Sequence, residues 1–318
     1  MLKKNHAGFI KDISVLVIGL SPDSKHQLQE MLKGQSVTLT FAQNVQEAKQ
    51  CILQDTLSLY NAYLFDNSQN YEENLMLLKA LKKRAQYAVV PVIFQADIED
   101  MSFVHQGLRL GVYFYLLKPY TQELLLSVLK ATVMGFDSQQ ALSQDLTTLE
   151  RGHDGRLESK LQVAKFHIKT IEDAKSLSCA LALIAPKPKE VALGLFELMT
   201  NAIEHGSLNI SYQEKTRFIQ ENCLQSEIND RHKLPQYCKK IVTVEFERKS
   251  DFLQFTIRDM GEGFDYAPYL DFSVERAMDN HGRGVMIANK LSFDELFYKD
   301  NGCTVVGRVL VESAPASC

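Results

Sequence analysis

The chain has 318 residues, a net charge of −4, and 45% hydrophobic against 23% charged residues. These values predict a globular protein of two domains and give no reason to expect a nucleic-acid partner. Its six cysteines show no Cys-x-x-Cys spacing, which favours reduced thiols over a disulfide framework or a zinc site. No apolar run approaches the roughly 18 residues of a membrane span, and none of signal-peptide type follows the basic N-terminus, so we expect a cytoplasmic protein without a membrane partner.

From residue 12 to about residue 135, short apolar runs of strand length alternate with amphipathic segments of helix length. This alternation predicts an α/β domain with a parallel sheet between two layers of helices, and five units predict a flavodoxin-like (βα)5 fold. Ligands of such folds bind at the carboxyl ends of the strands. The predicted strands are Ile13–Leu20, Val37–Phe41, Tyr63–Asp66, Val92–Gln95 and Val112–Leu117, and the predicted helices are Pro22–Lys33, Asn44–Gln54, 71–86, 98–110 and 121–134.

Chemistry-bearing residues mark the ends of three predicted strands. Asp66 ends the third strand, Gln95 ends the fourth, and Lys118-Pro119 follows the fifth. This arrangement resembles the receiver domain of bacterial response regulators. The resemblance implies that Asp66 is the phosphoacceptor position, that Lys118 contacts the phosphoryl oxygens, and that a cis peptide bond precedes Pro119.

The chain departs from the receiver pattern where the metal would bind. The family holds Mg²⁺ with two adjacent acids after the first strand, but Gly19 and Leu20 occupy these positions, and Gln95 replaces a hydroxyl residue. One carboxylate alone binds Mg²⁺ poorly, so the charge of an incoming phosphoryl group would not be neutralised. We predict that residues 1–135 form a degenerate receiver, not phosphorylated, that serves as a packing or dimerisation module. The alternative is residual phosphorylation assisted by Asp23.

Residues 136–162 are predicted to be a polar linker that includes helical structure. Leu142, Leu146 and Leu149 are spaced near 3.5 residues, so the preceding helix can continue through them. Such a stalk would be either the seam of a homodimer, which we favour slightly, or a helix on a domain surface. His153 lies between two glycines without room for a helical hairpin, and we interpret it as an exposed linker histidine rather than a phosphorylated one.

The elements after residue 163 predict an α+β sandwich with helices on one face of an antiparallel-rich sheet. The Asn301-Gly302 dipeptide indicates a hairpin between the last two strands. A polar segment, 207–240, is interpreted as a helical insertion whose charges are solvated or bind a partner or second subunit. The predicted helices are 171–185, 189–205 and 285–291, and the predicted strands are 166–170, 241–248, 252–258, 293–299 and 303–310.

The predicted helix at 189–205 places three polar side chains on one face. Glu197, Asn201 and His205 are four residues apart, and the preceding turns are almost wholly apolar. A carboxylate and an amide on a buried helix are costly unless something binds them. We therefore predict that this helix lines a site, and we interpret Gly206 as its C′ terminator.

Two glycine-rich turns follow in the sequence. Asp259 continues the buried face of its strand and precedes Gly261 and Gly263, which suits a ligand amine and a close backbone approach. A second turn precedes an apolar helix, where free N–H groups and the helix dipole favour phosphate. The residues of this second turn are Gly282, Arg283 and Gly284.

In this order, the three motifs resemble the ATP-binding domain of histidine kinases, gyrase-type ATPases and Hsp90, known as the Bergerat fold. The segment Asn-Ala-Ile-Glu-His-Gly is most similar to the anti-sigma-factor serine kinases. The resemblance covers about residues 163–311 and assigns residues 163–318 to an ATP-binding domain. It implies ATP and Mg²⁺ as cofactors.

The resemblance also implies roles for individual residues. Asn201 would coordinate Mg²⁺, and Asp259 would accept a hydrogen bond from the adenine amino group. Glu197 would be the general base, or would orient a Mg²⁺-bound water, whereas His205 is interpreted as a packing or capping residue. Gly261 and Gly263 would line the base pocket, and Gly282, Arg283 and Gly284 would contact phosphates beside a lid at about 265–280.

These expectations combine into a bacterial signal-transduction protein in which a degenerate receiver regulates an ATP-dependent kinase. The predicted kinase phosphorylates serine or threonine on a partner signalling protein, either an anti-sigma antagonist-like protein or a sigma factor. The alternatives are a non-catalytic ATP-dependent binding module and a histidine-kinase-like phosphodonor.

Overall fold

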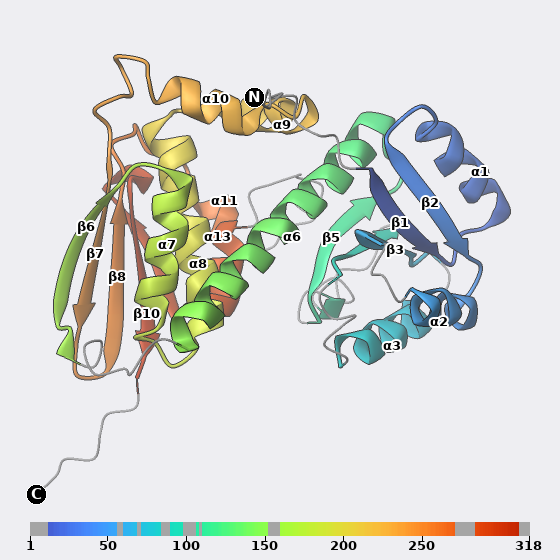
Figure 1. Ribbon diagram of the computed structural model, residues 1–318, viewed down its shortest axis with the longest axis horizontal. Coiled ribbons are helices and arrows are strands. Elements are labelled where there is room, and N and C mark those ends of the chain that lie inside the picture. Colours follow the sequence, from blue (N-terminus) through green and yellow to red (C-terminus); the bar gives the residue numbers. More distant parts are fainter. Residues whose placement is uncertain are drawn as a thin grey trace, which may run out of the picture. The chain divides into compact units, whose positions relative to one another are not determined.

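A five-stranded parallel sheet forms the centre of the first of two compact units, which holds most of residues 1–137 (Figure 1). The order of its strands is β2-β1-β3-β4-β5. β3 and β4 are buried along their whole length, as expected for central strands covered on both faces. The predicted flavodoxin-like α/β fold is therefore confirmed. The strands are β1 (Ile13–Ile18), β2 (Val37–Ala42), β3 (Ala62–Asp66), β4 (Val92–Ala96) and β5 (Val112–Leu117).

The computed structural model describes residues 12–55, 60–68, 71–83, 90–97, 106–107, 110–151, 160–270 and 284–311. The predicted helix at 98–110 therefore lies almost wholly outside the described residues, and so does His153. None of the helices in these ranges is both long enough and apolar enough to cross a membrane.

Four helices of the first unit follow the predicted alternation. Ser21 begins α1 by accepting a hydrogen bond from the Ser24 N–H group, and Asn44 begins α2 in the same way. α1 and the first half of α6 pack against one face of the sheet, and α2 and α3 lie on the other (Figure 1). The helices are α1 (Pro22–Met31), α2 (Val45–Gln54), α3 (Tyr71–Lys82) and α6 (Gln122–Arg151).

The second unit is built on a five-stranded antiparallel sheet in the order β6-β7-β8-β10-β9. Helices α7 and α8 cover one face of it (Figure 1). Between the layers, the ring of Phe255 lies 5.5 Å from that of Phe246 and 6.1 Å from that of Phe293. The predicted α+β sandwich is therefore confirmed. Its strands are β6 (Val163–Ile168), β7 (Val242–Arg248), β8 (Phe252–Arg258), β9 (Glu295–Lys299) and β10 (Thr304–Leu310), and the two helices are α7 (Ile171–Ala182) and α8 (Pro188–Asn201).

The polar insertion forms two helices, α9 (Tyr212–Gln220) and α10 (Leu224–Arg231). Each contributes an apolar side chain to the core of the second unit, because Phe218 is only 4% exposed and Ile228 only 3%. One face of the insertion is thus a structural part of this unit.

Helix α6 continues without a break through the predicted linker as far as Arg151. Leu142 and Leu146 are buried in the core of the second unit, whereas Leu149 is 40% exposed. The Lys175 ammonium group also lies 2.6 Å from the Asp145 carboxylate. This packing supports the alternative of a helix on a domain surface, because the two buried leucines are not available to a dimer seam.

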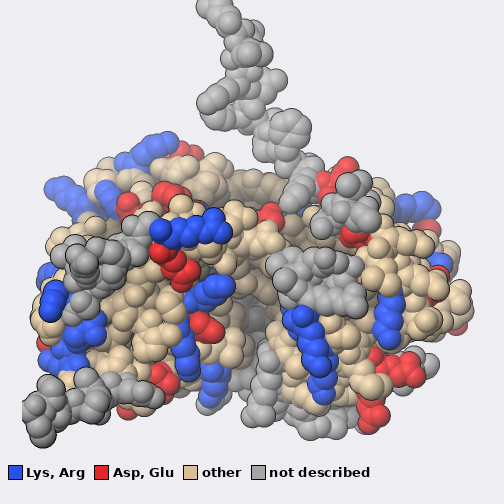
Figure 2. Space-filling view, turned by 60° about the horizontal axis from the view of Figure 1, so that its bottom comes forward, with Lys and Arg blue, Asp and Glu red and all other residues tan. Residues whose placement is uncertain are grey.

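On the face of the molecule shown in Figure 2, basic and acidic side chains are interspersed.

Replacement of Leu142 by alanine tests the packing of α6. We expect the free energy of unfolding of the second unit to fall by about 2–5 kcal/mol, because a buried leucine leaves a cavity when truncated. Calorimetric unfolding of the full chain measures the loss, with Leu149→Ala on the same helix as the matched control. Equal stability of the two variants would contradict this packing.

Candidate functional site

The polar face predicted on α8 runs into a π-helical turn, η2 (Ala202–Ser207), without a break. Asn201 lies at the junction, and the Leu208 N–H group closes the wide turn by donating to the Ile203 carbonyl at 2.9 Å. The prediction that Gly206 ends the helix as a C′ residue is therefore wrong. Gly206 lies inside the turn and is not among the residues with positive φ.

Gly206 is required by a contact that is distant in the sequence. A Cβ atom at this position would lie 2.6 Å from the Oδ2 atom of Asp259, and one at Gly261 would lie 2.6 Å from the Gly206 carbonyl oxygen. Both distances are shorter than van der Waals contact. The two glycines thus let the backbone of η2 and the turn after β8 enclose the Asp259 carboxylate, and we call these three residues the Asp259 cradle.

The Asp259 carboxylate has one hydrogen bond inside the cradle, from the Gly261 N–H group to Oδ1 at 2.7 Å. Burial raises the pKa of this carboxyl group, and the Gly261 N–H group opposes the rise. In its ionised form this carboxylate is an acceptor with lone pairs to spare. A group with an N–H donor, such as an amino substituent on a heterocycle, fits this chemistry.

The turn after β8 packs tightly against the turn between β9 and β10. Gly263 has φ +81° and Gly302 has φ +93°, a region that favours glycine. Cβ atoms at these positions would overlap Asn301 and Phe264, respectively, and the Phe264 N–H group donates to the Asn301 carbonyl at 3.0 Å. Gly263, which follows Asp259 in the second motif, therefore lies with Gly302 in one tightly packed wall.

Two residues near Asp259 were missed by the sequence analysis. The pKa of Tyr298 is raised by burial and by the charge of Asp259, and the Cys303 thiol donates to the Gly261 carbonyl at 3.4 Å. Tyr298 could have been found from the strand alternation, because Leu296 and Tyr298 both pack against the core. Nothing in the sequence distinguishes Cys303.

The carboxylate of Glu197 lies against the start of α13 (Gly284–Ile287). A Cβ atom at Gly284 would overlap this carboxylate, so the third motif meets the first at this point. The pKa of Glu197 is raised, mainly by burial. The positive charge of Lys215 opposes this rise, and the negative charge of Glu204 adds to it. Gly282 and Arg283 lie outside the described residues. The same holds for residues 271–280 of the lid that was predicted at 265–280.

His205 contacts the backbone of the segment that follows η2. Its Nδ1 atom lies 2.5 Å from the Ile210 carbonyl oxygen, while the Ile210 N–H group donates to the Glu204 carbonyl at 2.9 Å. Burial and the charge of Lys215 lower the pKa of His205. A largely neutral imidazole engaged with the backbone has the geometry of the capping role expected for it.

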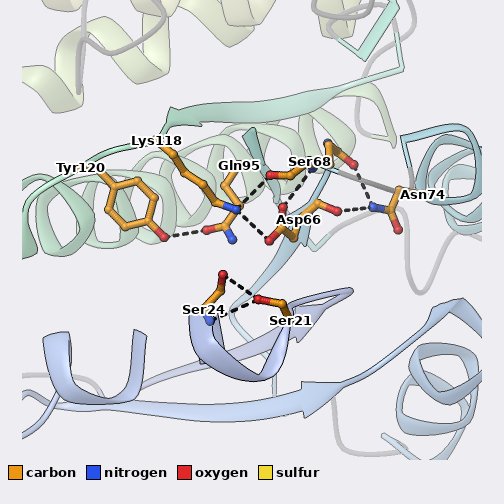
Figure 3. A network of polar contacts seen from close by, with 9 residues as sticks. Ser21, Ser24, Asp66, Ser68, Asn74, Gln95, Lys118 and Tyr120 are labelled. Carbon is orange, nitrogen blue, oxygen red and sulfur yellow. Dashed lines mark hydrogen bonds and ion pairs between the residues drawn. The ribbon is translucent and has the colours of Figure 1, made fainter. Parts of the chain in front are cut away.

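The predicted phosphoacceptor and lysine of the first unit form an ion pair (Figure 3). The Lys118 Nζ atom lies 2.8 Å from Asp66 Oδ2 and 2.9 Å from the Ser68 hydroxyl oxygen, and Asp66 is 5% exposed. The Lys118-Pro119 peptide bond is cis, as the receiver resemblance implies. The ammonium group thus neutralises the carboxylate that would otherwise bind a cation.

The surroundings of Asp66 do not fit Mg²⁺. Gly19 has φ +83°, which a side-chain-bearing acid rarely adopts, and Gln95 is fully buried with its Oε1 atom 2.7 Å from the Tyr120 hydroxyl (Figure 3). Among the described residues, no group of three or more His, Cys, Asp or Glu residues could hold a metal ion. One neutralised carboxylate is a poor site for a hard divalent cation.

Comparison with known families concerns the second unit. Residues 171–308 match the family described as the histidine kinase-like ATPase domain. Over residues 171–308 the second unit is therefore similar to a histidine-kinase-like ATPase domain. The matched range contains the Asp259 cradle, Glu197 and Asn201, so the geometry and the family point to the same part of the chain. No curated protein matches the chain.

Solved structures resemble part of the chain in fold. The receiver domain of a signal transduction histidine kinase from Syntrophus aciditrophicus is 21% identical over 38% of this chain and 90% of its own, with a TM-score of 0.33. Vibrio cholerae chemotaxis protein CheY4 is 19% identical over 37% of this chain and 96% of its own, with a TM-score of 0.34. The receiver domain of an HD domain-containing protein from Pseudomonas fluorescens Pf-5 is 20% identical over 40% of this chain and 99% of its own, with a TM-score of 0.36.

Replacement of Gly206 by alanine tests the cradle. We expect the affinity for a fluorescent ATP analogue to fall at least about tenfold, because the new methyl group displaces the Asp259 carboxylate from its hydrogen-bonding position. Ser207→Ala in the same turn is the control, since the buried Ser207 hydroxyl has no hydrogen-bond partner. Undiminished binding by a folded Gly206→Ala variant would show that the close approach is dispensable.

The Asp66 site generates a second prediction. We expect no phosphorylation of Asp66 with acetyl phosphate and Mg²⁺, because the metal has too few ligands at this site. Intact-protein mass spectrometry at neutral pH measures the modification, with Asp66→Asn as the control. An added phosphoryl mass that is present in the unsubstituted chain and absent from Asp66→Asn would refute the prediction.

Proposed function

We propose that the ATPase domain binds Mg²⁺-ATP and transfers the γ-phosphoryl group to a serine or threonine of a partner signalling protein. The proposal rests on two contacts made by one continuous helical element, α8 followed by η2. Its η2 end supplies Gly206 to the Asp259 cradle, and its Glu197 meets Gly284 of the phosphate-binding motif. One continuous helical element therefore reaches both the proposed base-recognition group and the proposed phosphate turn. ATP binding is also what a histidine-kinase-like ATPase domain implies.

The proposed residue roles follow the two ends of this element. Asp259 accepts a hydrogen bond from the adenine amino group, with Gly261 and Gly263 forming the wall beside it. Asn201 is the proposed Mg²⁺ ligand through its amide oxygen, and bound Mg²⁺ would supply charge neutralisation between the phosphates. The proposed phosphate contacts come from Gly282, Arg283 and Gly284.

Glu197 is the proposed general base. Its carboxylate accepts the proton of the acceptor hydroxyl as that oxygen bonds to the γ-phosphorus, the bond from the γ-phosphorus to the bridging oxygen breaks, and ADP leaves. Because burial raises the pKa of Glu197, the carboxylate is a better proton acceptor than an exposed glutamate. The rate of phosphoryl transfer should then rise with pH, and the midpoint of this rise should lie above the ordinary pKa of a glutamate.

The first unit has a different proposed role. Because Lys118 occupies the Asp66 carboxylate, we propose that the degenerate receiver, residues 1–135, regulates the kinase as a packing or dimerisation module rather than by phosphorylation. Residues 136–162 join it to the ATP-binding domain, residues 163–318. The proposed partner is an anti-sigma antagonist-like protein or a sigma factor, met in the cytoplasm by a monomer or homodimer of this chain.

Replacement of Glu197 by glutamine tests the proposed base. We expect phosphoryl transfer from labelled ATP to a protein of the source cell extract to fall by about 100-fold or more, while ATP binding is retained, because general-base catalysis contributes about 10²–10⁴. Glu190→Gln, an exposed position on the same helix, is the matched control.

The chemistry of the label separates the alternatives. Acid-stable label on serine or threonine supports the proposal, whereas acid-labile label on histidine supports a phosphodonor of the histidine-kinase type. A wild-type chain that binds ATP and labels no protein is a binding module, and the kinase proposal fails.

A further inference from the structure

Lys215 of the inserted helix α9 reaches the polar end of α8. Its Nζ atom lies 2.5 Å from Glu204 Oε2, and the two side chains are 15% and 5% exposed. Buried lysines are uncommon, and an ion pair out of water is retained only where both charges are compensated. The position therefore calls for an explanation beyond surface solvation.

The structure fixes α9 firmly enough to hold this ammonium group in place. Ser211 and Glu214 form a reciprocal cap at its first turn, with hydrogen bonds of 2.9 and 3.2 Å. Arg231 of α10 pairs with Glu214 at 2.6 Å and donates to the carbonyls of Leu208 and Asn209. Arg231 thus connects α9, which carries Lys215, to the irregular segment that follows η2.

The charge of Lys215 acts on the proposed catalytic group as well as on its partner. Among the described residues, the charged groups that act on Glu197 are Lys215 from α9 and Glu204 from η2, with His205 beside them. Gly284 at the start of α13 lies against the Glu197 carboxylate and brings no charged side chain. Two carboxylates close together would oppose one another's ionisation, and the single ammonium group offsets this repulsion.

We propose that Lys215 is a positioning residue of the phosphoryl-transfer site, and that the inserted helix α9 is therefore a functional part of the ATPase domain. Its ammonium group neutralises Glu204 and so leaves Glu197 free to act on the acceptor hydroxyl. This inference rests on the proposed function, in which Glu197 is the general base. The inference assigns the insertion a functional role that its polar sequence did not predict.

A charge-balancing role and a merely structural role differ in what a second substitution does. Lys215→Met leaves Glu204 buried without its partner, and the uncompensated charge then suppresses ionisation of Glu197. Replacing Glu204 by glutamine in the same chain removes that charge and should restore Glu197. If Lys215 only held α9 in place, the second substitution would restore nothing, because no ion pair would be regained.

The test uses the full chain with Mg²⁺-ATP and four variants: Lys215→Met, Lys215→Arg, Lys215→Met/Glu204→Gln and Lys233→Met. We expect Lys215→Met to lower kcat at least about tenfold at neutral pH with little change in KM for ATP. The midpoint of the rise of kcat with pH should move to higher pH. Lys215→Arg and the double variant should recover most of the rate. Lys233 of the same insertion pairs with Asp230 at 74% exposure and is the control that should behave as wild type.

A measurement without nucleotide separates this inference from the proposed function. The difference in infrared carboxyl absorption between each chain and its Glu197→Gln counterpart reports the protonation of Glu197 against pH. We expect Lys215→Met to shift that titration upward and the double variant to reverse the shift. An unshifted titration, or a double variant no better than the single one, overturns the inference. A wild type without ATP turnover overturns the proposed function, while the infrared result still decides the role of Lys215.

Discussion

The second unit depends on the close approach of two backbone segments to one carboxylate. Asp259 emerges at the end of β8 into the space left by Gly206 and Gly261, and a methyl group on either glycine would close that space. The wide π turn η2 brings Gly206 to this point, and the same helical element places Glu197 against Gly284. A tight steric contact therefore sets the distance between the proposed base-recognition group and the proposed phosphate turn.

The first unit keeps a flavodoxin-like fold, and the carboxylate at the end of its third strand is paired with an internal cation. Lys118 lies 2.8 Å from Asp66, and the left-handed Gly19 stands where a metal-binding acid would be needed. A fold can thus persist when the chemistry of its strand ends is lost, because the buried strands and their helices stabilise it independently. In the proposed account, control by this unit is a matter of packing, whereas charge at the end of α8 is set within the ATPase domain by Glu204 and Lys215.

Periodicity predicted most of the architecture, because strands and helices of ordinary length are encoded locally. The parallel sheet, the antiparallel sheet and the polar face of α8 all follow from the spacing of apolar residues. Gly206 was misjudged because the local rule for helix ends competes with a contact to Asp259 far along the chain. Lys215 was missed for a similar reason: its partner Glu204 precedes a change of chain direction, and the polar sequence of the insertion conceals how deeply Phe218 is buried.

In the proposed function, the Asp259 carboxylate recognises the amino group of adenine. Isothermal titration of the full chain with ATP and with inosine triphosphate, in the presence of Mg²⁺, tests this recognition most directly, because inosine has an oxygen in place of that amino group. We expect inosine triphosphate to bind at least about tenfold more weakly, because it loses a hydrogen bond to a partly buried carboxyl acceptor. Equal affinity for the two nucleotides would contradict it.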